Sequence, residues 1–253
     1  MKTQPLRGMK ILIPRTEEDA DSSAEIIKKL GGDPIPVKAV EIEYTEDLAK
    51  VDELLRKINE YHWVVFTSRN GVRIFADSMK KLGLVPYSIK CRIAAVCPST
   101  TIEAMNKGLS VSFTPSRYLT ETLAYELPDV KGSKILLIRS RNADDKMRKI
   151  LTQRGAYVDE VRPYAVKPVS DINPRCGFEA IILTSPSVVD AIRRSRKIME
   201  EIEKGALVCC IGPVTARAAR KLGIRTDLVA EEHSFPGVVN ALAERVVKGA
   251  GRT

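Results

Sequence analysis

The stretch Ala180-Ile-Ile-Leu-Thr-Ser-Pro-Ser-Val-Val-Asp-Ala-Ile192 predicts a short buried strand, a turn of small residues and an amphipathic helix. Its apolar start leads into Thr184-Ser185-Pro186-Ser187, which joins a capping side chain to a proline suited to a first helical turn. The same order recurs in Val208-Cys-Cys-Ile-Gly-Pro-Val-Thr-Ala-Arg-Ala218. Apolar strands that run directly into helices are typical of a parallel sheet covered on both faces. The strand-to-helix turns of such a sheet share one edge, where ligands bind.

The first half of the chain contains counterparts of these segments. Trp63-Val-Val-Phe-Thr-Ser-Arg-Asn-Gly71 matches the first stretch, with its serine offset by 185 − 68 = 117. Val96-Cys-Pro-Ser-Thr100 matches the second at an offset of 215 − 100 = 115. A third pair, Lys10-Ile-Leu-Ile-Pro-Arg15 and Lys134-Ile-Leu-Leu-Ile-Arg139, is offset by 139 − 15 = 124. Three ordered matches indicate two similar α/β units in one chain.

The remaining elements follow from periodicity and from start and stop signals. Besides the apolar strands, an extended segment is expected at 34–44 and another at 157–168, with shorter ones at 109–113 and 224–229. Glycines mark the ends of several expected helices. The helices are expected at 19–30, 47–60, 70–82, 99–107, 120–127, 145–154, 187–204, 213–222 and 235–248.

The composition is that of an ordinary globular protein. The 253 residues are 44% hydrophobic and 29% charged, enough for two domains with substantial cores. No apolar run approaches the roughly 20 residues of a membrane span, and residues 1–8 lack the apolar region of a secretory signal. We therefore expect a cytoplasmic protein without a membrane partner.

Cysteine and histidine usage argues against a metal centre. The five cysteines have no metal-ligand spacing, and four of them lie in or beside expected strands, which favours buried small hydrophobes over a redox role. Only two histidines are present, so a histidine-rich metal site is hard to build. We expect neither a metal nor another cofactor. The cysteines are Cys91, Cys97, Cys176, Cys209 and Cys210.

The charge balance of 41 − 32 = +9 suits a polyanionic partner. Nucleic acid is disfavoured, because the basic residues are scattered, aromatic residues make up only 5%, and no zinc-finger spacing or RNA-binding aromatic signature is present. The densest basic run, Arg193-Arg194-Ser195-Arg196-Lys197, is typical of a solvated helix face. A small molecule carrying many carboxylates fits a diffuse positive surface equally well.

Taken in order, these segments resemble the uroporphyrinogen-III synthase family. The resemblance spans nearly the whole chain, and its strength lies in the ordered set rather than in any one motif. One departure is Cys97, at a turn where the family often has glycine. The segments that carry it are Ile11-Leu-Ile-Pro-Arg15, Phe66-Thr-Ser-Arg-Asn-Gly-Val72, 158–164, Leu183-Thr-Ser-Pro-Ser-Val188 and Ile211-Gly-Pro-Val-Thr-Ala216.

The resemblance implies two flavodoxin-like domains with parallel sheets, joined by a two-stranded linker. It also implies an exchange of segments that the repeat alone does not predict. Residues 1–36 and 168–253 would form one discontinuous domain, and residues 44–160 the other. Residues 37–43 and 161–167 would be the linker strands, and their β-branched residues suit that role.

The same resemblance implies the reaction. Linear hydroxymethylbilane would lose water to give an azafulvene cation, which the terminal pyrrole attacks at its substituted carbon. The spiro intermediate then rearranges, which inverts that ring. Positioning and modest acid catalysis would dominate, without a cofactor. The protein would act as a monomer, with the upstream hydroxymethylbilane synthase as a candidate partner.

Candidate site residues lie at the ends of the strands. Tyr164, in the second extended segment, is by resemblance the candidate for a functional hydroxyl. Turn amides at helix N-termini suit the eight carboxylates of the substrate, and small polar residues allow close approach and add donors. The expected substrate-binding residues are Arg15, Thr67, Ser68, Asn70, Arg139, Ser140, Ser185, Ser187, Gly212 and Thr215.

Simpler interpretations stand beside these. The residues Thr67, Ser68, Thr184 and Ser185 could serve only as helix caps, Thr215 as an ordinary first-turn residue, Tyr164 as a packing residue of its strand, and the two strand-end arginines as surface salt-bridge partners. For the whole protein, a non-catalytic two-domain module that binds a polycarboxylate has the same sequence pattern. A racemase with paired cysteines and a flavodoxin-like electron carrier fit less well, since the cysteines are not at equivalent turns and no flavin phosphate loop is evident.

Overall fold

The computed structural model describes the backbone of residues 4–250 and the side chains of 4–16 and 23–249. The chain divides into two compact units. Unit 1 consists of Met1–Ile42 and Lys167–Thr253, and unit 2 consists of Glu43–Val166. The chain therefore passes from unit 1 into unit 2 and back. The linker segments expected at 37–43 and 161–167 contain both crossing points.

Unit 1 is built on a parallel sheet that has five strands among the described residues. The apolar residues in the middle of its central strands are buried, as the sequence predicts. The strand order is β11 (Leu228–Val229), β10 (Leu207–Cys210), β9 (Ala180–Leu183), β1 (Lys10–Arg15) and β2 (Asp33–Lys38).

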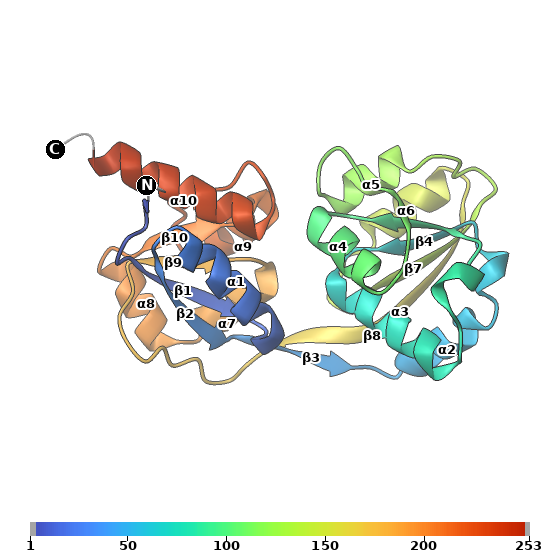
Figure 1. Ribbon diagram of the computed structural model, residues 1–253, viewed down its shortest axis with the longest axis horizontal. Helices are drawn as coiled ribbons and strands as arrows, with labels where there is room; N and C mark the ends of the chain where they lie inside the picture. Colours follow the sequence, from blue (N-terminus) through green and yellow to red (C-terminus); the bar gives the residue numbers. More distant parts are fainter. Residues whose placement is uncertain (1–3, 251–253) are drawn as a thin grey trace. The chain divides into compact units, whose positions relative to one another are not determined.

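Helices cover both faces of this sheet (Figure 1). One core joins α1 (Glu17–Lys29) and α10 (Phe235–Ala250) to alternate residues of the strands, such as Ile11, Ile182 and Cys209. On the other face α7 packs against both α8 and α9. These three helices span Pro186–Arg193, Arg196–Glu203 and Pro213–Lys221.

Unit 2 is built on a second sheet, which has six strands among the described residues. Strand β3 runs antiparallel beside β8, because hydrogen bonds join Thr45 N to Pro163 O at one end and Val169 N to Ala39 O at the other. Strand β8 pairs in parallel with β7, β7 with β4, β4 with β5, and β5 with β6. The order is β3 (Val40–Tyr44), β8 (Tyr157–Pro168), β7 (Lys134–Ser140), β4 (Trp63–Phe66), β5 (Arg92–Ala95) and β6 (Val111–Phe113).

The helices of unit 2 also form two layers (Figure 1). A core around Trp63 and Leu137 packs α5 and α6 on one face, whereas Phe66 meets Phe75 of α3 edge-on at 5.2 Å on the other. Helix α3 in turn contacts α2 and α4. The helices are α2 (Leu48–Leu55), α3 (Arg69–Lys81), α4 (Pro98–Asn106), α5 (Thr120–Glu126) and α6 (Lys146–Gln153), with 3₁₀ turns at Ile58–Glu60 and Pro86–Ser88.

The two sheets have the same spatial order once the repeats are aligned. Strands β2-β1-β9-β10-β11 of unit 1 correspond to β8-β7-β4-β5-β6 of unit 2. This is the 2-1-3-4-5 order of flavodoxin-like folds. The expected fold class, an α/β protein of two similar parallel-sheet units, is confirmed. In unit 2 the strands equivalent to the third, fourth and fifth come first in the chain, and unit 2 as a whole follows β2 of unit 1.

Three element predictions were wrong in detail. The single helix expected at 187–204 is two helices, and the helix expected at 47–60 ends as α2 at Leu55 before a 3₁₀ turn. Only Leu228–Val229 of the segment 224–229 is a strand. The first break has a clear cause. Ser195 has extended φ and ψ of −90° and 106°, and it starts α8 by accepting from Ile198 N. The basic run of residues 193–197 therefore spans the junction between α7 and α8 rather than one helix face.

Ser195→Ala is expected to lower the free energy of unfolding by about 1–2 kcal/mol, because it removes a cap and a buried hydrogen bond. The Ser195 hydroxyl donates to Ile172 O at 2.6 Å and is only 8% exposed. Urea unfolding at neutral pH measures the change. Exposed Ser110→Ala serves as the control and should stay within about 0.5 kcal/mol of wild type. Equal midpoints for the two variants would contradict the capping role.

The cysteine prediction holds for two residues only. Cys209 and Cys210 are buried in β10, and burial raises the pKa of their thiols to about 12 and about 11. Cys91 and Cys97, beside expected strands, are only half-buried, so the expectation was wrong in part for them. Cys176, which lies outside the expected strands, is exposed. A paired-cysteine mechanism would require cysteines at equivalent positions of the two units. Cys210 lies inside a strand, whereas Cys97 is the N-cap residue of α4, so the two positions are not equivalent.

Candidate functional site

The carboxyl edge of the unit 2 sheet places Ser68 at the start of a helix. Strand β4 is fully buried up to Phe66, and Ser68 then takes the extended φ and ψ (−161° and 160°) of an N-cap. Its Oγ accepts from Gly71 N at 3.2 Å. A Cβ on Gly71 would lie 3.0 Å from Ile138 O, so glycine lets the first turn of α3 sit directly on β7. The predicted capping role of Ser68 is confirmed.

Tyr164 reaches this turn from β8. Its Oη lies 2.5 Å from Ser68 Oγ, and either oxygen can be the donor. The side chain is 2% exposed. Burial raises the pKa of the phenol above its usual value, against smaller opposing effects of the Ser68 hydrogen bond and the Arg139 charge. The phenol is therefore protonated at neutral pH, and its partner Ser68 is half-buried.

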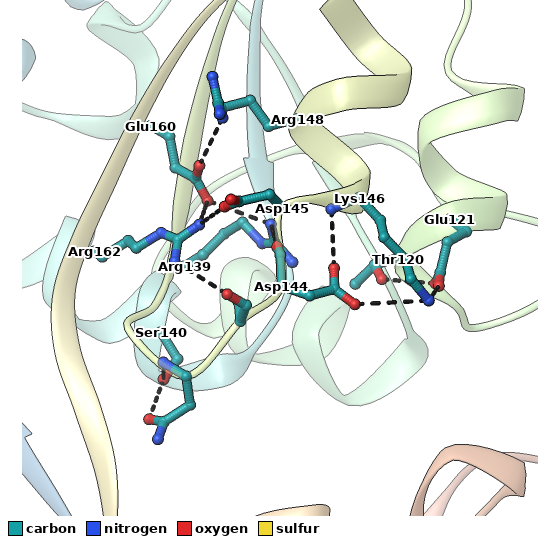
Figure 2. Close-up of polar contacts among 12 residues, drawn as sticks. Thr120, Glu121, Arg139, Ser140, Asp144, Asp145, Lys146, Arg148, Glu160 and Arg162 are labelled. Atoms are coloured by element: carbon teal, nitrogen blue, oxygen red, sulfur yellow. Dashed lines mark hydrogen bonds and ion pairs between the residues drawn. The ribbon is translucent and has the colours of Figure 1, made fainter.

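The loop after β7 fixes the backbone around Tyr164. Arg141 N donates to Tyr164 O at 2.7 Å. Ser140 lies opposite Tyr164 in the ladder, and its Oγ donates to Asn142 Oδ1 at 2.9 Å. The same Oδ1 accepts from Val166 N at 2.7 Å. Ser140 thus holds a loop that closes on β8 (Figure 2).

Arg139 lies on the opposite face of the sheet from Ser140. It is 2% exposed, and its Nη1 donates to Asp144 O at 2.8 Å and contacts Glu160 Oε1 at 3.3 Å. Figure 2 shows it within a cluster of charged side chains under α6. Arg139 is a salt-bridge partner, but the bridge is buried rather than on the surface, and this burial disfavours direct contact with a substrate carboxylate.

The carboxyl edge of unit 1 repeats the arrangement without the tyrosine. Ser185 is the N-cap of α7 and accepts from Val188 N at 3.3 Å, which confirms its capping role. Arg15 ends β1, hydrogen-bonds to Ser23 Oγ and lies 5.0 Å over the Phe235 ring. Its side chain is half-buried, so this arginine is the more accessible of the two strand-end arginines.

Gly212 and Thr215 occupy the next turn of unit 1. Gly212 caps α9 in an extended conformation that any residue can adopt, but a Cβ there would lie 3.0 Å from His233 Cδ2. Glycine is required by the neighbouring ring rather than by its own backbone. Thr215 is 3% exposed, which fits the interpretation as a first-turn packing residue. His233 was not among the expected residues, because a loop histidine has no pattern in the sequence.

The other expected residues lie in the same turns. Each is half-buried and so retains some contact with solvent. They are Thr67 and Asn70 in unit 2, and Ser187 in unit 1. Two charged residues of β8 that lie beside Arg139 in the charge cluster, Glu160 and Arg162, were not among the expected residues. They stand in a strand that reads as an ordinary alternation of polar and apolar residues.

Neither a candidate membrane span nor a candidate metal site is found in the described part of the chain. No helix of residues 4–250 is long and apolar enough to cross a membrane. No group of three or more His, Cys, Asp or Glu side chains among residues 4–16 and 23–249 is arranged to hold a metal ion.

Comparison with known proteins gives consistent matches. The family described as uroporphyrinogen-III synthase HemD matches residues 21–240. A porphyrin biosynthesis protein HemD of Ruminiclostridium josui is 28% identical over 252 residues, which cover 95% of this chain and 49% of that protein. The chain therefore spans about half the length of that relative. The chloroplastic uroporphyrinogen-III synthase of Oryza sativa subsp. japonica is 28% identical over 212 residues, covering 78% of this chain and 68% of that protein.

The fold has a solved counterpart as well. A mutant uroporphyrinogen III synthase of the extremely thermophilic bacterium Thermus thermophilus superposes with a TM-score of 0.62 at 16% identity, covering 96% of this chain and all of that one. At this identity the likeness concerns the fold alone, and it matches the two parallel-sheet units described above.

Proposed function

Because the chain belongs to the uroporphyrinogen-III synthase family, we propose that it closes hydroxymethylbilane into uroporphyrinogen III with loss of water. The resemblance first noted in the sequence is confirmed by this family membership. The observation that carries the proposal at the level of the site is the 2.5 Å contact between Ser68 Oγ and Tyr164 Oη. It joins a phenol to the turn that follows β4, a buried strand of unit 2.

Tyr164 and Ser68 are the proposed proton donors. As the carbon–oxygen bond of the hydroxymethyl group breaks, the bonding electrons leave with oxygen. A proton from the hydrogen-bonded Tyr164 and Ser68 hydroxyls completes the water molecule. Burial keeps the pKa of Tyr164 high, so the phenol holds its proton until the leaving group takes it. The final aromatisation of the inverted ring releases a proton, which reprotonates the Tyr164 and Ser68 hydroxyls. No other co-reactant is needed.

The carboxylates of the substrate are proposed to bind at the strand-to-helix turns. The turns capped by Ser68, Ser185 and Gly212 present backbone N–H groups at helix N-termini, where anions are favoured. Arg15 adds a guanidinium at the end of β1. Thr67, Asn70, Ser140 and Ser187 are proposed as further donors. Arg139 and Thr215 are proposed to support the turns from within, because both are buried.

The remaining sequence-based expectations stay predictions. These are the domain boundaries at 36, 44, 160 and 168, a monomeric state, a cytoplasmic location, and the upstream hydroxymethylbilane synthase as partner. The compact units, which change at 42–43 and 166–167, support a division of the chain close to those boundaries.

An isomer assay tests the function. Hydroxymethylbilane closes spontaneously to the symmetric type I isomer, so type III product above that background is expected when the purified protein is added without metal or cofactor. The two isomers are resolved by chromatography after oxidation. An unchanged isomer ratio would reject the enzyme and favour the polycarboxylate-binding alternative.

A further inference from the structure

The pairing of β7 with β8 changes register at one place. Residues Ile138–Ser140 of β7 lie opposite Val161–Tyr164 of β8, so β8 advances three residues where β7 advances two. The extra residue makes a β-bulge at Arg162-Pro163. Proline is tolerated at such a point, because it has no N–H to donate to the ladder.

The bulge decides which face of the sheet carries Tyr164. Successive strand residues point to opposite faces, and a shift by one residue exchanges the faces of all that follow. Val161 shares the α3 face with its partner Ile138. In an unbroken register Pro163 would lie opposite Ser140, and Tyr164 would point toward α5 and α6. With one extra residue, Tyr164 takes the place opposite Ser140 and meets Ser68.

Unit 1 lacks this irregularity. Its equivalent strands β1 and β2 keep one register from Lys10 opposite Asp33 to Arg15 opposite Lys38. The repeat offset of 124 places Lys38 at the position of Arg162, since 162 − 38 = 124. The two units therefore diverge at the residue where β8 bulges, and only the bulged unit has a tyrosine next to its serine cap.

A buried carboxylate lies behind the bulge, on the face opposite Tyr164. Glu160 is 8% exposed as a side chain. Its Oε1 contacts Arg139 Nη1 at 3.3 Å and Arg162 Nη2 at 3.2 Å, and its Oε2 contacts Arg148 Nε at 3.6 Å. Figure 2 shows Glu160 enclosed by these three arginines. One carboxylate thus links β7, the bulge and α6.

Arg162 is held at both its backbone and its side chain. Its N donates to Asp47 Oδ2 at 3.2 Å, and its O accepts from Thr45 Oγ1 at 2.7 Å. Its Nη1 donates to Ala143 O at 3.0 Å, and its Nη2 contacts Asp145 Oδ1 at 2.5 Å. These bonds take up the backbone groups that a bulge removes from the ladder, and they tie the side chain to the loop after β7.

We infer that Glu160 is a positioning residue that holds Arg139 and Arg162 so that the bulge turns Tyr164 toward Ser68. The inference rests on the proposed function in one respect, the consequence for the reaction. The charge cluster does not touch the phenol. It acts through the path of β8, because moving Arg162 back into the ladder would turn Tyr164 to the other face.

The test combines kinetics with a probe of Tyr164 itself. The protein is labelled with tyrosine carrying ¹³C at Cζ, whose chemical shift reports hydrogen bonding and ionisation of the phenol. The Tyr164 resonance is the one missing from Tyr164→Phe. The variants are Glu160→Gln and Arg162→Gln. The second keeps Glu160 between Arg139 and Arg148, so it leaves no buried carboxylate unpaired and guards against a folding failure of the first.

Asp159→Asn is the matched control. Asp159 is the neighbour of Glu160 in β8, but its Oδ2 accepts from the Tyr61 hydroxyl at 2.6 Å, away from the bulge. This variant should move the Tyr61 resonance and leave that of Tyr164 in place. Glu160→Gln and Arg162→Gln should move the Tyr164 resonance in the direction seen in Ser68→Ala, which removes the hydrogen bond directly.

The expected kinetic effect is a fall in kcat for type III product of about tenfold to a hundredfold, with KM within about twofold, as for a misplaced catalytic group. An unmoved Tyr164 resonance in folded Glu160→Gln would overturn the inference, whatever its activity, and Arg162→Gln decides in the same way if Glu160→Gln does not fold. A moved resonance with wild-type kcat would also overturn it. If wild-type protein forms no type III isomer, the proposed function fails, while a moved resonance still supports the positioning of Tyr164.

Discussion

Tyr164→Phe is expected to lower kcat for uroporphyrinogen III formation about a hundredfold, without abolishing it, while the protein still folds. Loss of one donor aimed at a developing charge costs about 3 kcal/mol in the barrier. The substrate's own pyrroles supply the nucleophile, so slow water loss and guided closure should persist. The buried ring keeps its packing, because only the hydroxyl is removed. Rates with purified variants, with circular dichroism to check folding, measure the effect.

The matched control for Tyr164→Phe is Tyr157→Phe, a 72% exposed tyrosine on the same strand. It should retain wild-type kcat. Full activity in Tyr164→Phe would remove the acid role. The Ser68 contact adds a second comparison, since two residues that donate as a unit are not additive. The double variant with Ser68→Ala should therefore be little slower than the more damaged single variant. A multiplicative loss would show that the two hydroxyls act separately.

Sequence patterns were sufficient for the architecture and for the helix caps. Buried strands such as β4 and β9 are apolar throughout, and each is followed by a small polar residue that caps the next helix. Local sequence alone fixes such features, because the capping serine bonds a backbone N–H three residues later. The repeat offsets then placed equivalent strands in equivalent positions of the two sheets.

The contacts and burial of the two strand-end arginines could not be predicted in the same way. Arg15 and Arg139 occupy equivalent positions in the repeat, yet Arg15 lies over the Phe235 ring and Arg139 is buried against Glu160. Each outcome depends on a partner from another element, which differs between the two units. The bulge in β8 could not be predicted either, because Arg162-Pro163 fits an extended segment whether or not β8 has one residue more than β7 at that point.

Gly237→Ala is expected to destabilise the protein by about 1–3 kcal/mol, the range for an overpacked site. A Cβ on Gly237 would lie 2.3 Å from Glu232 O and 2.8 Å from Glu232 Cβ. Because the first of these atoms is backbone, rotation of a side chain cannot relieve the clash. The loop must move instead, and with it the Ser234 hydroxyl that accepts from Gly237 N at 3.0 Å.

The displacement should reach the carboxyl edge of unit 1, since the same loop carries His233. Its ring lies so close to Gly212 that a Cβ there would be 3.0 Å from Cδ2. The chain has only two histidines, so the His233 ring resonance is readily assigned by comparison with His62. In Gly237→Ala the His233 resonance should shift and that of His62 should not. Urea unfolding supplies the stability.

Gly249→Ala is the matched control in the same helix, because among the described residues a Cβ there would meet no heavy atom within 4 Å outside its chain neighbours and the helix's own backbone. Alanine has the higher helix propensity, so this variant should be unchanged or up to about 1 kcal/mol more stable. The pair separates a steric effect on the loop from a general effect of replacing glycine in α10. Equal stability of the two variants, with His233 unmoved, would show that the loop yields without cost and does not fix the ring over Gly212.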